Sequence, residues 1–173
     1  MRFTKNKVFI VAEIGNNHEG KLSNAFKLID KAKEAGVDAV KFQTYDVKKY
    51  YSSNTDKKRI KRLKQFQLSY NSIIKLSNYA KKLGLVFFST PFDERSAVFL
   101  NQIQNIFKIS SGDNDFHNLI EKVLTFKKPI IISTGMMDFK EVKKLYQFIK
   151  KKNLRVKFVF YIVFLAIQCQ SMN

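Results

Sequence analysis

Lys41 and Lys108 each interrupt a short apolar run of the chain. Residues with hydroxyl groups stand at the ends of such runs, among them Thr90 and Ser111. Two lysines that converge with these hydroxyl groups would form a clamp for a phosphate and a carboxylate. Either lysine alone is more often a surface residue, so the hypothesis depends on the two acting together. The sequence therefore predicts an anion-binding site.

Glu13 and Gln43 are two further polar residues that follow apolar runs. Glu13 directly follows an apolar run, where a carboxylate is costly unless it is paired or useful. It could bind a sugar hydroxyl or relay a proton; the alternative is a structural acceptor for loop amides. Gln43 lies two residues after Lys41, so in a strand the two side chains share one side and Phe42 faces the other.

His18 and His117 are the only histidines, and neither has a second ligand at metal-binding spacing. We interpret His18 as a structural hydrogen-bonding group of its loop rather than as a metal ligand. No nucleophilic triad can be assembled from the sequence. A metal used in the reaction would therefore have its ligands outside this chain.

Alternating apolar runs and helical segments predict the framework that positions these residues. We expect strands at 8–12, 37–42, 85–88, 106–109 and 129–132, a sixth from 156 onward, and helices at 22–35, 69–83, 93–102, 116–126 and 138–152, with one more helical segment before 69. Gly36 is a helix stop, Asp93 a helix cap, and Asp138 with Glu141 a capping box. Helices of this length connect parallel strands, whose carboxyl ends then share one face.

Repeated strand–helix units form either an open doubly wound sheet or an eight-stranded barrel. The loop from Gly15 to Gly20 lacks the three glycines of a dinucleotide-binding fingerprint, and polar residues at every strand end favour the barrel. We predict an α/β fold of the TIM (β/α)8 barrel type, incomplete, with about five and a half βα units. At 173 residues, with no break in composition, one domain is expected.

The formal charge of +18 raises nucleic acid as a partner. The chain has 27 Lys but only 5 Arg, and Arg is the usual reader of bases. Together with abundant Asn, Ile, Phe and Tyr, this composition indicates AT-rich coding acting on solvated positions. The densest basic cluster, 57–64, fits a solvated helix face better than a phosphate-contacting stripe. We do not expect a nucleic-acid partner, although a basic nucleic-acid-binding protein remains the alternative function.

The cellular setting follows from a few absences in the sequence. A single cysteine, Cys169, excludes an internal disulfide, and the first apolar run meets Glu13 too early for a signal peptide. The longest apolar stretch, 158–167, is about half of the roughly 20 residues that span a bilayer. We expect a cytoplasmic protein without a membrane partner.

Five ordered segments resemble the N-terminal barrel of the N-acetylneuraminate (sialic acid) synthase family, which includes the legionaminate and pseudaminate synthases. They are EIGNNHEG (13–20), DAVKFQT (38–44), FFSTPFD (87–93), FKISSGD (107–113) and KPIIISTGM (128–136). The resemblance extends over about 8–152. It implies condensation of phosphoenolpyruvate with an N-acetylated amino sugar, such as N-acetylmannosamine, to a nonulosonic acid, with release of phosphate. A divalent metal, Mn or Mg, polarises the sugar aldehyde in this family.

Matching motifs assign roles to seven residues. By resemblance, Lys41, Thr90, Lys108 and Ser111 would hold phosphoenolpyruvate, and Glu13, Gln43 and Asp113 would face the sugar and the reacting carbons. Asp113 stands where many family members have Glu, so its carboxyl group reaches one methylene less far.

The C-terminal region departs from the family pattern. The resemblance implies further strands with two metal-binding histidines, then an antifreeze-like domain that lends an arginine to a partner subunit; none of these is in this sequence. Reading the codons of 161–173 two bases later, with permissible wobble choices, gives the family's Ser-Ser-Tyr-Pro motif. We therefore expect a frameshift near residue 160, so that 1–173 is the N-terminal portion of a barrel.

A truncated barrel would have consequences for activity and assembly. We expect the chain alone to be poorly stable and inactive, because an open sheet exposes its edges. The family's homodimer is not expected of this chain. A non-catalytic fragment that associates with a full-length synthase is a further alternative.

Overall fold

The computed structural model describes residues 8–50, 57–152 and 158–161. Its strands are β1 (Val11–Gly15), β2 (Ala39–Thr44), β3 (Val86–Pro91), β4 (Phe107–Ile109), β5 (Ile130–Ser133) and β6 (Phe158–Tyr161). Its helices are α1 (Leu22–Glu34), α2 (Val47–Tyr50), α3 (Lys57–Phe66), α4 (Tyr70–Lys82), α5 (Glu94–Leu100), α6 (His117–Thr125) and α7 (Phe139–Lys151). This alternation confirms the predicted α/β class.

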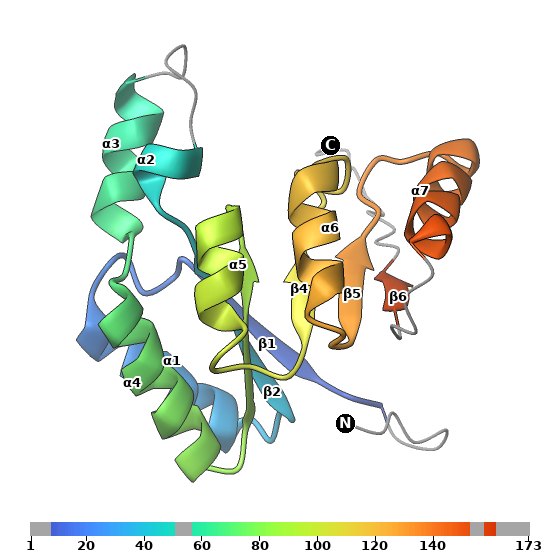
Figure 1. The fold of residues 1–173 in the computed structure, drawn as a ribbon. Helices are drawn as coiled ribbons and strands as arrows, with labels where there is room; N and C mark the ends of the chain where they lie inside the picture. The colour runs from blue at the N-terminus through green and yellow to red at the C-terminus, as the bar shows by residue number, and fades with distance from the viewer. Residues whose placement is uncertain (1–7, 51–56, 153–157, 162–173) are drawn as a thin grey trace, which may run out of the picture.

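All paired strands run parallel, in two sheets ordered β1-β2-β3 and β4-β5-β6. The sheets meet where β3 lies beside β4, and the helices lie outside the strands (Figure 1). Because parallel strands all end on the same side, the loops after β1 to β5 gather at one edge. We call this edge the carboxyl edge.

The predicted strand bounds were wrong by up to three residues at each end. The first strand begins at Val11 rather than Val8, and Val8 and Ile10 are exposed. The strands also continue past their apolar runs, so Glu13 and Thr90 lie within β1 and β3 instead of after them. Ladder hydrogen bonds join backbone groups, so a polar side chain does not end a strand.

Strand alternation separates two faces. Side chains such as Val40, Phe42 and Phe107 are fully buried against the helices in the main core. The opposite face, which we call the inner face, carries a small apolar cluster built on Ala39, Phe88 and Ile106. The main core therefore supports the sheet from outside, and the inner face is available for a site.

The helix boundary signals predicted at Gly36, Asp93, Asp138 and Glu141 are confirmed. Asp93 caps α5 by accepting a backbone N–H, and Ser69, which was not predicted as a cap, does the same for α4. Asp138 and Glu141 form the reciprocal capping box of α7. Gly36 follows α1 with φ +75°, the left-handed conformation that ends helices.

Gln104 joins β3 to the segment before β4. Its Oε1 accepts from the Ser89 backbone N–H at 2.7 Å, and its Nε2 donates to the Ser89 carbonyl at 3.1 Å. Lys128 Nζ in turn donates to the carbonyls of Gln104 and Asn101. The Gln104 amide thus satisfies strand backbone groups where no ladder bond joins β3 to β4.

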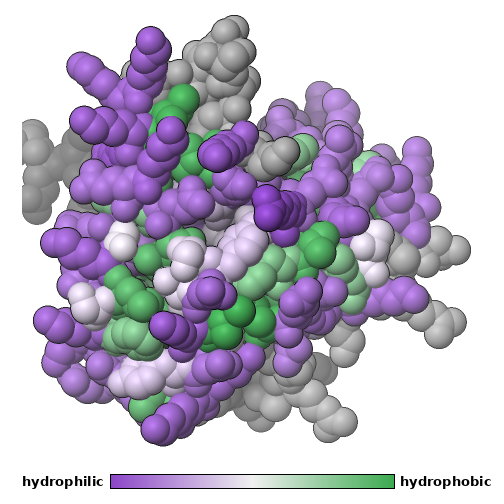
Figure 2. All heavy atoms as spheres, turned by 60° about the vertical axis from the view of Figure 1, so that its left-hand side comes forward, coloured by the Kyte–Doolittle hydropathy of each residue, from purple (hydrophilic) through white to green (hydrophobic). Residues whose placement is uncertain are grey.

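Hydrophilic side chains dominate the molecular face that carries α1, α3 and α4, broken by smaller apolar areas (Figure 2). This fits the charge of +18, because most lysines lie on exposed helix positions. In the described part of the chain, no helix has the length and apolar character needed to cross a membrane.

Gly20 fixes the loop between β1 and α1. Its φ is +76°, and a Cβ there would overlap the carbonyl oxygen of Gln65 at the end of α3. Gly36 has nearly the same φ, +75°, with open space around it. Substitutions at the two glycines therefore distinguish the cost of backbone strain, which both share, from the cost of steric overlap, which only Gly20 has.

We expect Gly20→Ala to lower the free energy of unfolding far more than Gly36→Ala. Gly36→Ala should cost about 1–2 kcal/mol, the strain of a left-handed alanine. Gly20→Ala adds a clash with backbone and should cost at least about 2 kcal/mol more. Urea denaturation followed by circular dichroism measures both, and equal losses would contradict the close approach of the loop to α3.

Candidate functional site

Lys41 and Glu13 form an ion pair on the inner face. They are direct partners in the β1–β2 register, and Lys41 Nζ lies 2.6 Å from Glu13 Oε2. The Lys41 side chain is only 6% exposed, whereas that of Glu13 is 58% exposed. A buried ammonium requires a compensating charge, which Glu13 provides from the solvent side.

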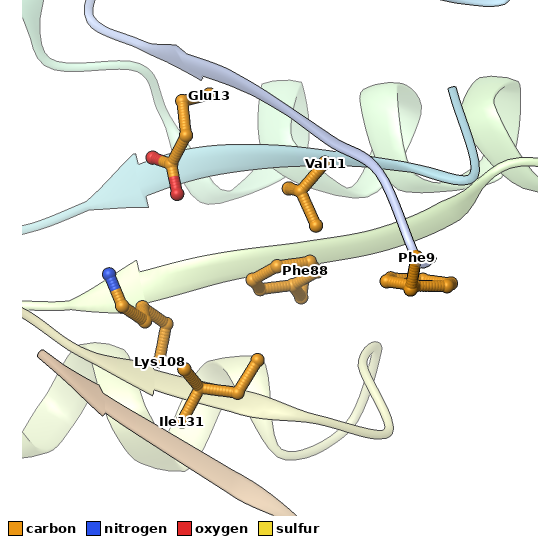
Figure 3. Close-up of a pocket in the computed structure, with 6 residues that line it drawn as sticks. All are labelled: Phe9, Val11, Glu13, Phe88, Lys108 and Ile131. Carbon is orange, nitrogen blue, oxygen red and sulfur yellow. The ribbon is translucent and has the colours of Figure 1, made fainter. Parts of the chain in front are cut away.

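Lys108 faces the same region from β4 and lines a cavity of about 180 Å³. Figure 3 shows Glu13 and Lys108 at one end of the cavity and apolar side chains at the other. The lining residues are Phe9, Val11, Glu13, Phe88, Lys108 and Ile131. Burial lowers the pKa of Lys108, the positive charge of Lys41 lowers it further, and Glu13 opposes both effects. The two lysines thus interact electrostatically across the inner face.

Thr90 and Gln43 extend this polar region along the strands. They are register partners on β3 and β2, and Gln43 lies on the same side of β2 as Lys41. Thr90 is 1% exposed, and its Oγ1 has no hydrogen-bond partner in the described structure. A buried hydroxyl in this state is available to a ligand, because leaving it unpaired is costly.

Ser89 points to the other face and does not join the site. Its Oγ lies 2.7 Å from Oγ1 of Thr44, and both side chains are buried. Because side chains alternate along β3, the two adjacent hydroxyl groups lie on opposite faces, that of Thr90 on the inner face and that of Ser89 toward the helices.

Asp113 lies in the loop after β4, with its carboxyl group buried. The residue is 5% exposed, and Oδ2 has no hydrogen-bond partner among the described residues. Burial, followed by the negative charge of Asp115, raises the pKa of Asp113 to about 6, while a hydrogen bond with Ser110 opposes the shift. Such a carboxyl group can exchange a proton near neutral pH.

Ser111 belongs to the same loop but is exposed. It packs against the next loop, since a Cβ added to Gly135 would lie 2.7 Å from the Ser111 Cβ. Gly135 has φ +58°, so both its conformation and the space around it require glycine. Ser111 therefore stands at the carboxyl edge beside the loop after β5.

Asn114 was missed by the sequence reasoning. Its Nδ2 donates to the carbonyls of Ser133, at 3.2 Å, and Thr134, at 2.8 Å, and the residue is buried. No motif or spacing pointed to this residue. The only signal was an amide side chain directly after a candidate carboxylate.

The structural hydrogen bond predicted for His18 is present, and its buried Nε2 has no hydrogen-bond partner among the described residues. Its Nδ1 accepts from the Gly20 backbone N–H at 3.0 Å, and its ring stacks on Phe42, which faces the helices. Burial lowers the pKa of His18, which favours the neutral ring. Among the described residues, no three His, Cys, Asp or Glu side chains gather in a way that could hold a metal ion.

Sequence comparisons identify relatives over most of the chain. The model of the NeuB family matches residues 28–162. N,N'-diacetyllegionaminic acid synthase of Legionella pneumophila is 38% identical over 78% of this chain and 42% of its own length. Human N-acetylneuraminate-9-phosphate synthase is 32% identical over 84% of this chain and 44% of its own length. The chain thus spans less than half the length of these relatives.

Solved structures agree with this result. A sialic acid synthetase of Leptospira borgpetersenii, crystallised with citrate, superposes with a TM-score of 0.84 at 31% identity, covering 91% of this chain and 54% of that one. DAHP synthase of Thermotoga maritima, at 16% identity and a TM-score of 0.69 over 92% of this chain and 44% of that one, shares the fold alone. On the family match and these relatives, the chain belongs to the NeuB family.

Proposed function

We propose that this chain forms the phosphoenolpyruvate-binding side of a nonulosonic acid synthase. One observation carries the proposal: buried Lys41 and half-buried Lys108 act on each other across the inner face, beside the unpaired hydroxyl of Thr90. Two neighbouring cations and a hydroxyl donor suit a small ligand with a phosphate and a carboxylate. The names of its relatives, synthases of legionaminic and N-acetylneuraminic acid type, support this substrate class.

The proposed reaction joins an enolpyruvate phosphate to an N-acetylated amino sugar. A carbon–carbon bond forms between C3 of phosphoenolpyruvate and the aldehyde carbon of the sugar, and the aldehyde oxygen takes up a proton. Water adds to C2 of the former phosphoenolpyruvate, and the C2–oxygen bond to the phosphoryl group is lost as inorganic phosphate leaves. The protein must therefore bind an anion, orient an aldehyde and move protons.

The anion side consists of Lys41, Lys108, Thr90 and Ser111. An anion between the lysines relieves their mutual repulsion, and it would raise the pKa of Lys108 toward its ordinary value. Thr90 supplies a hydroxyl from β3, and Ser111 supplies another from the carboxyl edge. This arrangement makes binding strongest for a ligand with two separate negative groups.

The sugar side consists of Glu13, Gln43 and Asp113. Glu13 is exposed at the mouth of the cavity, and Gln43 is half-buried next to it along the strands, so both can reach sugar hydroxyl groups. With a pKa of about 6, Asp113 is mostly ionised at neutral pH and can accept a proton there. We assign Asp113 the proton-transfer role.

We further propose that the six strands are part of a TIM (β/α)8 barrel that the 173-residue chain does not close on its own, about five and a half βα units of the eight. The shared fold with larger synthases supports this. Most of the expected frameshifted segment, 162–173, lies outside the described residues. Among the described residues, no three His, Cys, Asp or Glu side chains could hold the Mn or Mg ion that the resemblance implies.

We expect Lys108→Met to weaken phosphoenolpyruvate binding at least tenfold, about 1.4 kcal/mol, because a positive charge next to the anion is lost. Lys143→Met, at an exposed position of α7, is the matched control and should bind like the unmodified chain. Titration calorimetry measures both. Equal affinities for the two variants, or no binding by the folded unmodified chain, would exclude this anion site.

We expect the purified chain alone to form no nonulosonic acid from phosphoenolpyruvate, N-acetylmannosamine and manganese. The physical reason is that an unclosed barrel leaves the inner face open to water and without the contributions of later strands. Chromatographic detection of product in a single-turnover mixture tests this. Product formed by the chain itself would overturn the inactivity proposal while leaving the anion site intact.

Asp113 makes stability depend on pH. Its pKa rises from 3.8 to about 6 on folding, so between these values the folded state retains a proton that the unfolded state releases. The contribution of Asp113 to the free energy of unfolding is therefore fully present below about pH 4 and is lost as the pH rises through 6.

We expect Asp113→Asn to remove this loss of stability with rising pH, because asparagine does not titrate. The difference in unfolding free energy between Asp113→Asn and the unmodified chain should rise by about 1–3 kcal/mol from pH 4 to pH 7. Urea denaturation across this range measures it. Asp115→Asn, at an exposed position, should keep most of the decline, and parallel pH profiles for Asp113→Asn and the unmodified chain would refute the raised pKa.

A further inference from the structure

Two neighbouring loops are fastened together at the carboxyl edge. The loop after β4 runs through 110–116, and the loop after β5 begins at Thr134. Asn114 Nδ2 donates to the last carbonyl of β5, that of Ser133, and to the carbonyl of Thr134. One buried amide group thus holds two successive backbone carbonyls of the adjacent element.

Several other hydrogen bonds of the first loop are internal. The N–H of Asp113 donates to the carbonyl of Ser110 at 3.1 Å, and the N–H of Phe116 donates to the carbonyl of Asp113 at 3.1 Å. The N–H of Gly112 donates to Ser110 Oγ at 3.2 Å. These bonds shape the loop but do not attach it to β5. In the described structure, both side-chain hydrogen bonds from this loop to the end of β5 come from Asn114.

Packing adds a second point of attachment. Gly135 approaches Ser111 so closely that a Cβ would lie 2.7 Å from the Ser111 Cβ. This contact lies on the Ser111 side of Asp113, and the Asn114 hydrogen bonds lie on the other side. Asp113 is therefore held between two contacts with the same neighbouring loop.

We propose that Asn114 is a positioning residue whose two hydrogen bonds to the end of β5 keep the adjoining Asp113 carboxyl group buried at the carboxyl edge. The inference concerns the position and solvation of Asp113. It does not depend on the identity of the substrate, so it stands or falls separately from the proposed function.

The chemistry of the amide explains why asparagine suits this position. Both partners are carbonyl oxygens, so the side chain must donate, and the Nδ2 group carries two hydrogens, one for each carbonyl. An aspartate there would face two carbonyls with no donor, and an alanine would leave both buried acceptors unpaired. In either case the loop is released from β5 and water reaches Asp113.

Solvation of Asp113 has a measurable consequence. Burial is the main reason that the pKa of Asp113 is raised, and Asp115 is the charged residue that adds to it. If the loop opens, the effect of burial is removed and only the effect of the Asp115 charge remains. The pKa of Asp113 therefore reports whether Asn114 acts on its position.

The test is a carbon-13 carboxyl NMR titration of the full chain in a stabilising osmolyte, with Asp113→Asn used to assign the resonance. We expect the Asp113 pKa to be about 6 in the unmodified chain. In Asn114→Ala it should fall by at least about one unit, toward the ordinary aspartate value. An unchanged Asp113 pKa in folded Asn114→Ala would overturn the proposal.

Gln104→Ala is the matched control. Gln104, like Asn114, is a buried amide that makes two hydrogen bonds to the backbone of a strand, but it acts at Ser89 on β3. We expect Gln104→Ala to lose comparable stability and to keep the Asp113 pKa of the unmodified chain. An equal fall of the pKa in both variants would show a general loosening and would also overturn the proposal.

Asn114→Ser provides the test if Asn114→Ala does not fold. Serine keeps one donor on a shorter side chain, so it can satisfy at most one of the two carbonyls. We expect an Asp113 pKa between those of a solvated aspartate and the unmodified chain. A value equal to that of the unmodified chain would show that the two hydrogen bonds do not determine the burial of Asp113.

Discussion

The buried ammonium group of Lys41 is the constraint on which the inner face depends. Burying a positive charge without a nearby anion is costly, and Glu13 supplies the anion from the paired position on the neighbouring strand. This pairing requires one β1–β2 register, because a shift by one residue would turn every side chain of β1 to the other face. Ordinary strand alternation turns the next residue, Ile14, to the main core, and the β1–β2 register becomes irregular between Glu13 and Gly15.

Strands and loops contribute differently to the site. Lys41, Thr90 and Lys108 project from strands, whose position is fixed by ladder bonds and by the core under the helices. Asp113 and Ser111 belong to a loop, where position has to be established by individual contacts. The proposed anion side is therefore built into the sheet, while the proposed proton-transfer residue, Asp113, depends on how one loop is attached to its neighbour.

Local rules explain which features the sequence could predict. Alternation placed Lys41 and Gln43 opposite Phe42, and the caps at Asp93 and Asp138 followed from the chemistry of helix ends. The predicted C-terminal ends of β1 and β3 were wrong because ladder hydrogen bonds join backbone groups whatever the polarity of the side chains. Periodicity could predict only where the site residues lie; the roles proposed for them come from the family resemblance.

Tertiary hydrogen bonds could not be predicted in this way. Nothing near Asn114 in the sequence indicates that its amide meets carbonyls 19 and 20 residues later, at the end of another strand. The same holds for Gln104, which pairs with a backbone 15 residues earlier. Amide side chains suit many positions, and only the assembled fold decides which backbone groups lack a partner. The raised pKa of Asp113 could not be predicted from the sequence either, because it depends on the burial of its carboxyl group in the folded loop.

The short side chain of Asp113 gives these loop contacts their importance. The carboxyl group of an aspartate is one methylene closer to the backbone than that of a glutamate and has one rotatable bond fewer. If the loop moves, the side chain can compensate less, so the position of the carboxyl group follows that of its own Cα. The contacts on either side of it, Ser111 against Gly135 and Asn114 against the end of β5, constrain that Cα. A longer carboxylate could reach the same point from a less constrained loop, whereas an aspartate requires the backbone itself to be held.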